Sequence, residues 1–313
     1  MNSLVIPVYG NSETIDTLVE TIEGIEGQLP DELETIFVID GSPDDSRERL
    51  VAALGRSEIR ARIVDHSRNF GSFAAIRTGM SVARGERIAV MAADLQEPPE
   101  LVIEFLRRLA EHDVDVVAGE RLSRSDRGDS ASKLYWRMYR RFVLPDVPPG
   151  GVDVFACTAT VRDLICSLES VHTSLVAQLF WVGFRREIVP YDRLPSDTPS
   201  GWTTRRKLRY LADSVFAFTD LPVRALWAIG LGGIVLAVLI ALAVLIAKVT
   251  GTIHVPGYAA TVLVIVLFGS LNMAGLGIIG SYVWRAYETV KGRPGAIVRD
   301  VVEFPRPREG RDD

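Results

Sequence analysis

The stretch Ile88–Glu100, IAVMAADLQEPPE, carries the pattern that decides the fold. It opens with an uncharged apolar run from Ile88 to Ala93, which is typical of a strand buried on both faces. The run then breaks at Asp94 and is followed by the double proline Pro98-Pro99. Because proline cannot continue a central strand but suits the first turn of a helix, we expect the strand to end at Asp94 and a helix to begin near Pro98.

Asp94 and Gln96 place a carboxylate and a carboxamide at the carboxyl end of this strand. In open α/β sheets this edge is where ligands bind. Two oxygen ligands with open positions beside them suit Mg²⁺ or Mn²⁺ shared with a phosphate substrate. The same residues also fit an ordinary strand-to-helix connection in which Asp94 caps the helix. The spacing alone leaves both interpretations open.

Apolar strands alternate with amphipathic helices through the first 120 residues, and this alternation predicts a doubly wound α/β domain with a mostly parallel sheet. The strands are expected at Ser3–Val8, Glu34–Ile39, Arg62–Val64, Ile88–Ala93 and Asp115–Gly119. Polar residues follow three of them at one edge, as Tyr9, Asp40 and Asp94. The chain has neither GxGxxG nor GxxxxGK[ST], so neither a dinucleotide-binding fold nor a P-loop is supported.

After Arg121 the chain becomes basic and aromatic, up to Arg141. Such a mixture binds nucleic acid, an anionic substrate or a membrane surface, and a merely solvated basic helix also stays open. The acidic remainder of the domain argues against nucleic acid. Beyond this segment, residues 181–184 and 188–192 are expected to form a strand pair or one bent strand.

Two long runs lack any charge, and they predict membrane helices. Trp227–Ala247 has 21 residues and would span about 31 Å at the rise of an α-helix, while Val255–Trp284 is longer. Lys207–Leu221 before the first run has an apolar face and a basic start, which predicts an amphipathic helix on the membrane surface.

Charge divides unevenly along the chain. Residues 1–199 hold 22 Lys/Arg and 32 Asp/Glu, a net charge of −10, whereas residues 200–313 hold 13 and 8, a net charge of +5. The basic excess flanks the two apolar runs, so the positive-inside rule predicts both termini in the cytosol and the hairpin loop outside. No signal peptide is expected, and Cys157 and Cys166 are interpreted as small apolar residues and not as a disulfide.

Six sequence motifs together resemble family 2 glycosyltransferases of the polyisoprenyl-phosphate type, the group that includes dolichyl-phosphate mannose synthase and the bacterial enzymes that glycosylate undecaprenyl phosphate. The motifs occur in the expected order, and the resemblance covers residues 5 to 224. They are VIPVYGNSETI (Val5–Ile15), VIDGSPDDS (Val38–Ser46), SRNFGSFAAIRTGM (Ser67–Met80), ADLQEPPE (Ala93–Glu100), VDVFA (Val152–Ala156) and WVGFRREIVPYDR (Trp181–Arg193).

The resemblance implies a GT-A fold and an inverting transfer of a sugar from a nucleotide sugar, a UDP-sugar more than GDP-mannose, to a polyisoprenyl phosphate such as undecaprenyl phosphate. It implies that Asp94 and Gln96 hold Mg²⁺ or Mn²⁺. It places nucleotide contacts at Pro7, Tyr9, Asp40, Ser67 and Asn69. Phosphate contacts are implied at Arg121 and Arg124, and Asp153 is implied near the reacting centre.

This chain departs from the family pattern at three places. Ile39 and Ala92 stand where the family usually has aspartate, and Ser200–Thr203 lacks the usual lysine. A catalytically weakened relative that serves as a membrane-anchored binding or scaffold subunit is therefore kept as the alternative. A processive polysaccharide synthase is disfavoured, because Trp181 lacks the Gln-x-x-Arg-Trp context and two spans are few for a channel.

The expected organisation has four parts. Residues 1–204 form a cytosolic catalytic domain, 205–225 an amphipathic juxtamembrane helix, 226–285 two transmembrane helices at about 227–247 and 257–284, and 286–313 a cytosolic tail. We expect a multi-pass protein of the cytoplasmic membrane that acts in cell-envelope glycan assembly. A second copy of the chain is retained as a candidate partner.

Overall fold

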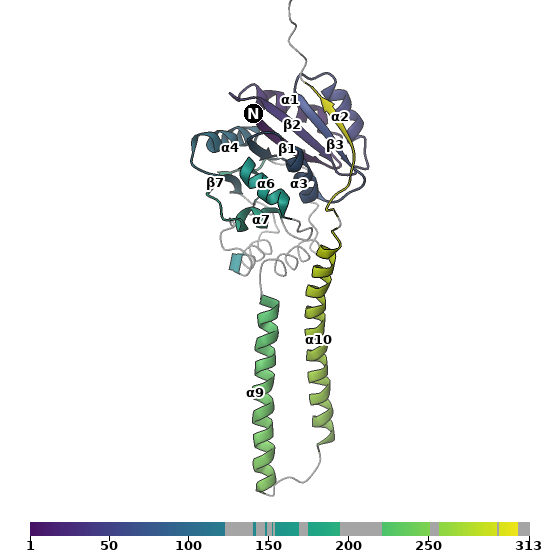
Figure 1. Ribbon diagram of the computed structural model, residues 1–313, viewed down its shortest axis with the longest axis vertical. Helices are drawn as coiled ribbons and strands as arrows, with labels where there is room; N and C mark the ends of the chain where they lie inside the picture. Colours follow the sequence, from purple (N-terminus) through teal and green to yellow (C-terminus); the bar gives the residue numbers. More distant parts are fainter. Residues whose placement is uncertain are drawn as a thin grey trace, which may run out of the picture. The chain divides into compact units, whose positions relative to one another are not determined.

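The computed structural model describes residues 1–122, 140–141, 148, 152, 154–168, 175–194, 221–250, 257–292 and 294–305. Among them, eight strands form one sheet in the order β7-β5-β6-β4-β1-β2-β3-β8 (Figure 1). The strands are β1 (Asn2–Val8), β2 (Leu33–Ile39), β3 (Arg60–His66), β4 (Arg87–Val90), β5 (Val116–Arg121), β6 (Phe155–Thr158), β7 (Arg186–Tyr191) and β8 (Val298–Phe304).

The sheet is mixed, where the sequence predicts a mostly parallel one. Strand β1 pairs in parallel with β2 and β4, β2 with β3, and β5 with β7. Strand β6 runs antiparallel to both β4 and β5, and β8 runs antiparallel to β3. Because β6 is antiparallel to both β4 and β5, these two strands run in the same direction, and β7 runs parallel to them. The carboxyl ends of β1, β2, β3, β4, β5 and β7 therefore lie along one edge, called the carboxyl edge below.

Helices cover both faces of the sheet, as the alternating pattern predicts. Helices α1 (Ile15–Glu26), α2 (Ser46–Leu54) and α4 (Pro99–Glu111) contact one another through α1, and α4 lies against β4, β5 and β6. Helix α3 (Ser72–Val82) lies against β1 and β2, and it contacts α6 (Ala159–Ser167), which contacts α7 (Leu175–Trp181). Side chains alternate along β1, so Leu4, Ile6 and Val8 enter the core formed with α1 and α4.

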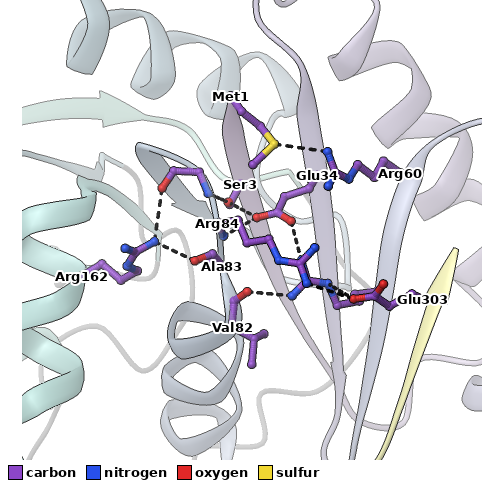
Figure 2. A network of polar contacts seen from close by, with 11 residues as sticks. Met1, Ser3, Glu34, Arg60, Val82, Ala83, Arg84, Arg162 and Glu303 are labelled. Atoms are coloured by element: carbon purple, nitrogen blue, oxygen red, sulfur yellow. Dashed lines mark hydrogen bonds and ion pairs between the residues drawn. The ribbon is translucent and has the colours of Figure 1, made fainter. Parts of the chain in front are cut away.

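A buried polar network holds the amino ends of the parallel strands on the face that α3 covers (Figure 2). Glu34 on β2 accepts hydrogen bonds from the Ser3 hydroxyl at 2.7 Å and from the Arg62 guanidinium at 2.8 Å. The backbone N–H of Arg84 donates to the same carboxylate at 2.5 Å. Arg62 also donates to the carbonyl of Val82 at 2.8 Å, which is the last residue of α3. The network therefore fixes the carboxyl-terminal end of α3 on the sheet.

The structure corrects the prediction for residues 181–192. Trp181 ends helix α7, and only Arg186–Tyr191 forms a strand. Residues 182–185 form a turn and an irregular connection, because Gly183 has a φ of +78° and Trp181 is exposed at the end of α7. Strand β4 is also shorter than expected, because it ends at Val90 and the chain continues to Asp94 without regular structure.

The second compact unit is Leu211–Arg293, which contains α9 (Leu221–Val249) and α10 (Tyr258–Val290). Within the described residues, Leu267–Trp284 in α10 is the stretch long and apolar enough to cross a membrane, and Val223–Gly233 in α9 is a shorter apolar stretch. One predicted span is thus met by length and composition, and the hairpin as a whole stays a prediction. The predicted juxtamembrane helix falls mostly on residues 195–220, outside the described part of the chain.

Strand β8 is a feature that the sequence patterns do not reveal. Residues 286–313 are predicted as a cytosolic tail, yet Val298–Phe304 adds an edge strand to the sheet beside β3. Val302 and Phe304 pack partly buried against the core, whereas Val298 and Val301 are exposed. A segment that follows α10 in sequence therefore completes the sheet that β1 to β7 form.

Candidate active site

The carboxyl edge brings together several of the residues predicted to bind the nucleotide and the metal. Tyr9 follows β1 and is 51% exposed. Ser67 and Asn69 lie in the loop after β3 and are exposed. Asp94 follows β4 with a half-buried side chain. Pro7 lies within β1 opposite Val38, one step back from the edge.

Asp44 joins the two loops that follow β1 and β2. Its carboxylate accepts hydrogen bonds from the hydroxyls of Ser42 at 2.5 Å and Ser46 at 2.7 Å, and from the backbone N–H of Ser12 at 3.1 Å. The hydroxyl of Ser42 in turn accepts from the N–H of Gly10 at 2.8 Å. Burial raises the pKa of Asp44, but these hydrogen bonds lower it by more than burial raises it. The pKa therefore lies below the ordinary value, and the carboxylate stays ionised. The loop that carries Tyr9 is thereby fixed.

Asp40 is buried at the end of β2, with 4% of its side chain exposed. Its Oδ1 accepts hydrogen bonds from His66 Nδ1 and from the N–H of Phe70, both at 2.8 Å, and its Oδ2 accepts from the N–H of Gly71 at 2.7 Å. Burial raises the pKa of Asp40, but the hydrogen bonds from His66 and the two N–H groups outweigh it and lower the pKa overall. Through these hydrogen bonds Asp40 fixes the loop after β3.

Two glycines allow the loop after β3 to approach the end of β2. Gly41 has a φ of +60°, and a Cβ there would lie 2.4 Å from the carbonyl carbon of Arg68. Gly71 has a φ of +100°, which residues with a side chain rarely adopt, and it immediately precedes α3. The glycines of the motif pairs Gly41-Ser42 and Phe70-Gly71 are thus required by the backbone conformation.

The Asp94 carboxylate faces a cation of the protein. Its Oδ1 accepts the N–H of Gln96 at 3.3 Å, and its Oδ2 lies 3.5 Å from Nη2 of Arg193. The turn is tight, because Leu95 has a φ of 52°, and the hydroxyl of Thr14 holds it by donating to the carbonyl of Ala93 at 2.9 Å. Gln96 itself is 9% exposed, and its carbonyl accepts the N–H of Leu194 at 2.8 Å.

Arg193 is a site residue that the sequence reasoning missed. It lies just after β7, and its Nε is 3.8 Å from the buried carboxylate of Glu97. It is the last residue of the motif WVGFRREIVPYDR, so the signal was present, but neither a spacing nor a chemical pattern singled it out from the neighbouring arginines.

A divalent ion fits the geometry at Asp94 under one condition. Among the described residues, no group of three His, Cys, Asp or Glu side chains could hold a metal ion. Mg²⁺ usually needs only one or two protein carboxylates when phosphate oxygens supply other ligands. Asp94 is 35% exposed and makes one long hydrogen bond and one loose ion pair, so its oxygens have free lone pairs. The site suits an ion that arrives with a diphosphate.

The predicted phosphate-binding and reacting residues are only partly described. Arg121 is the last residue of β5, so it lies at the carboxyl edge in a half-buried position. Arg124 and Asp153 lie outside the described residues. Val154, next to Asp153 in sequence, is bonded through its carbonyl to the N–H of Gly119 on β5 at 3.0 Å.

Comparison with known proteins points to one family. The profile of glycosyl transferase family 2 matches residues 3–165. An uncharacterized glycosyltransferase of Synechocystis is 31% identical over 96% of this chain and 95% of its own length. A prophage bactoprenol glucosyl transferase homolog of Escherichia coli is 28% identical over 96% of this chain and 98% of its own length.

A solved structure shares the fold. Glucosyl-3-phosphoglycerate synthase from Mycobacterium tuberculosis, in complex with Mn²⁺, uridine diphosphate and phosphoglyceric acid, superimposes with a TM-score of 0.50 at 17% identity, over 68% of this chain and 76% of that one. At this identity the likeness speaks to the fold alone. It agrees with the GT-A-like sheet described above, and the profile match extends over β1 to α6. The chain belongs to glycosyl transferase family 2.

Proposed function

We propose that this glycosyltransferase moves a sugar from a nucleotide sugar, preferably a UDP-sugar, to a polyisoprenyl phosphate such as undecaprenyl phosphate at the cytosolic face of a membrane. One observation carries the proposal. A protein named as a bactoprenol glucosyl transferase homolog aligns with 96% of this chain, so the likeness includes the two long helices as well as the sheet.

The donor is proposed to bind at the carboxyl edge. Tyr9 is exposed there on a loop that Asp44 fixes, and Ser67 and Asn69 present exposed side chains from the neighbouring loop. Asp94 and Gln96 would hold Mg²⁺ or Mn²⁺, which when bound neutralises charge on the leaving diphosphate.

The acceptor chemistry asks for positioning more than for a base. A phosphate monoester is already anionic near neutral pH, so no side chain must remove a proton before it attacks the sugar carbon. The protein must instead hold two anionic groups close together, the donor diphosphate and the acceptor phosphate. Arginine suits this task because its planar guanidinium can bind phosphate through two parallel hydrogen bonds. Arg121 and Arg193 lie at the carboxyl edge, and Arg124 follows Arg121 closely in sequence. Asp153 is proposed to lie near the reacting centre.

The membrane part of the proposal rests on the two long helices. Leu267–Trp284 meets the length and composition of a span, and Trp227–Ala247 is an uncharged run within α9. With basic residues flanking both, the catalytic domain and both termini are proposed to be cytosolic. Reporter fusions at Gly251 and at the C-terminus should report opposite sides of the membrane, and a result on the same side would contradict the hairpin.

The arginines after β5 are proposed to serve the lipid phosphate. Arg124→Ala should raise the apparent Michaelis constant for undecaprenyl phosphate or lower turnover, while donor binding changes little. Arg56→Ala is the control, because Arg56 is an exposed arginine just after α2 that pairs with Asp16 on α1. A loss of donor binding in Arg124→Ala would assign the residue to the nucleotide instead.

The alternative function is a binding or scaffold subunit that has lost turnover, which the alanine at position 92 and isoleucine at position 39 favour. One assay separates the two. Purified full-length protein is offered a panel of UDP-, GDP- and dTDP-sugars with undecaprenyl phosphate, and the lipids are analysed by mass spectrometry. A lipid heavier by one sugar residue supports the enzyme, whereas binding of a nucleotide without any product supports the subunit.

A further inference from the structure

We propose that the buried pair Asp40–His66 is a positioning element of the donor site, which holds the loop Ser67–Gly71 in the backbone geometry that the nucleotide meets. The inference rests on the proposed function, since it takes the carboxyl edge as the donor site. It assigns a role to His66, which no sequence motif singles out, and it replaces direct nucleotide contact by Asp40 with an indirect role.

Asp40 is enclosed by its own partners. Both of its oxygens accept hydrogen bonds at 2.7 to 2.8 Å, and 4% of its side chain is exposed. These three bonds use most of the acceptor sites of the carboxylate, and its low exposure means that a nucleotide could reach it only if the loop after β3 moved. Asp40 therefore acts on the donor through the loop that it holds.

His66 links three elements of the domain. It ends β3, its Nδ1 bonds Asp40 after β2, and its Nε2 lies 2.9 Å from the hydroxyl of Thr78 on α3. Because an ionised carboxylate can only accept, Nδ1 must carry the proton. With that proton on Nδ1, Nε2 accepts a hydrogen bond from the Thr78 hydroxyl. The residue is 2% exposed, so the orientation of its ring is set by these two partners.

The held loop has little freedom and faces outward. The N–H groups of Phe70 and Gly71 both point at Asp40, while Ser67, Arg68 and Asn69 are exposed. The Phe70 ring packs edge-on against the His66 ring, with centroids 5.5 Å apart, and the Arg68 guanidinium lies 4.0 Å from the Phe70 centroid. The backbone bonds of Phe70 and Gly71 thus set where the side chains of Ser67, Arg68 and Asn69 are presented.

The start of the loop is held from the other side by β8. The N–H of Ser67 donates to the carbonyl of Ile297 at 2.9 Å, and Val298 lies opposite His66 in the ladder. His66 is therefore confined between β2 and β8, and the loop leaves the sheet from a fixed point.

The chain contains a matched control for Asp40. Glu34 lies on β2, the strand that Asp40 follows, and is equally buried. It accepts hydrogen bonds from two side chains and one backbone N–H, but it sits at the amino ends of the strands (Figure 2). Asp40→Asn and Glu34→Gln both replace an accepting oxygen by a donating NH₂ group in a site of donors. Both should lower the unfolding midpoint, and only Asp40→Asn should loosen the loop.

The experiment measures UDP binding with Mn²⁺ by isothermal titration on full-length protein in detergent, together with hydrogen exchange of residues 67–71. Asp40→Asn should weaken UDP binding at least tenfold and speed exchange at Phe70 and Gly71 at least tenfold. Glu34→Gln should leave both unchanged at a temperature where it is folded. Equal weakening in both variants, or unchanged UDP binding in Asp40→Asn, overturns the positioning role.

A milder pair keeps the test decisive if Asp40→Asn fails to fold. Thr78→Val removes the hydroxyl that orients His66, and Thr78→Ser keeps it. UDP binding should weaken several-fold in Thr78→Val and return in Thr78→Ser, with acceptor saturation unchanged in both. Equal UDP binding in the two variants contradicts the inference. If the wild-type protein binds none of UDP, GDP and dTDP, the proposed donor site itself is wrong and the inference falls with it.

Discussion

Strand β2 carries one buried carboxylate near its start and another just past its end, with nearly the same surroundings and different consequences. Glu34 and Asp40 are each 2% exposed, and each accepts hydrogen bonds from side chains and backbone N–H groups. Glu34 joins Ser3 and Arg62 across the amino ends of the strands, away from the carboxyl edge. Asp40 holds a loop whose other side chains are exposed. The chemistry of a buried acid is thus the same at both ends, and its role depends on what it holds.

Helix α3 connects the two regions. Asp40 bonds N–H groups where α3 begins, and Arg62 donates to the carbonyl of Val82 where α3 ends. An anion at the amino end and a cation at the carboxyl end both complement the helix dipole. The helix is therefore fixed at both ends by buried charges, and the carboxyl edge gains a rigid loop from it.

Asp94→Asn should have the largest effect at the carboxyl edge. Replacing this partly exposed carboxylate after β4 removes the charge that a metal on the donor diphosphate would use, so sugar transfer should fall by roughly a thousandfold. Asp300→Asn is the control, because Asp300 is an exposed acid on β8 that pairs with Arg47. The capping role that the sequence left open for Asp94 is not seen, because α4 has Pro98 as its N-cap and no side-chain cap. A nearly silent Asp94→Asn would mean that Asp94 serves only the turn in which it accepts the N–H of Gln96.

At the amino ends of the strands, Arg62→Leu should cost stability and spare donor binding. It leaves Glu34 as an uncompensated buried charge and the Val82 carbonyl without its partner, at a cost of about 3 kcal/mol. Arg84→Leu should cost far less, because the Arg84 guanidinium is exposed and its backbone N–H still donates to Glu34. Denaturant unfolding of the two variants measures the difference. Similar losses in both would mean that the buried pair adds little to stability.

The two carboxylates after β2 make the domain acid-sensitive. Burial raises the pKa of Asp40, but its hydrogen bonds lower it below the ordinary value of 3.8, and the pKa of Asp44 is lowered in the same way. Because the unfolded chain then takes up protons first as the pH falls, this stabilisation is present above pH 3.8 and is lost as the pH falls through the folded pKa.

Asp40→Asn should therefore flatten part of the loss of stability at acid pH. Unfolding midpoints of the wild type and the variant between about pH 5 and pH 2.5 test this. The two curves should converge towards low pH. Curves that stay parallel would show that Asp40 does not titrate with folding.

Arg193→Gln should give the smallest effect. In the donor-free protein Arg193 lies 3.5 Å from the Asp94 carboxylate, where it competes with a divalent cation for the same charge. Removing the guanidinium should tighten Mn²⁺ binding to donor-free protein by about threefold, since exposed ion pairs contribute roughly 0.2–1 kcal/mol. Arg186→Gln is the control, because Arg186 begins β7 and its guanidinium lies over the ring of Phe180. Weaker Mn²⁺ binding in Arg193→Gln would show that Arg193 supports the metal.

The sequence predicts the carboxyl edge better than the parts that surround it. Strands β1 to β4 follow from apolar runs that end in polar residues, so the expectation that Tyr9, Asp40 and Asp94 share one edge is confirmed. Strand β8 escapes prediction because charged residues interrupt its exposed valines and its partner β3 comes far earlier in the chain. The strand expected at residues 181–184 is wrong because α7 ends at Trp181 and Gly183, with a φ of +78°, turns the chain before β7 begins.

The roles within the site are harder to predict than its place. A motif letter does not reveal whether a carboxylate faces solvent or its own backbone, and Asp40 and Asp94 differ in just this respect. His66 belongs to no pattern that periodicity can detect, since its partners Asp40 and Thr78 come from two other parts of the chain. Only the fold brings them together.

Titration of Mn²⁺ with and without UDP, on the wild type and on Asp94→Asn, tests most directly whether the carboxyl edge is the donor site. With one carboxylate available at Asp94, the wild type should bind Mn²⁺ weakly alone and much more tightly with UDP, because the diphosphate completes the coordination. By linkage, Mn²⁺ should tighten UDP binding by the same factor. Asp94→Asn should lose this mutual dependence. Equal Mn²⁺ affinities in all four titrations would contradict the assignment.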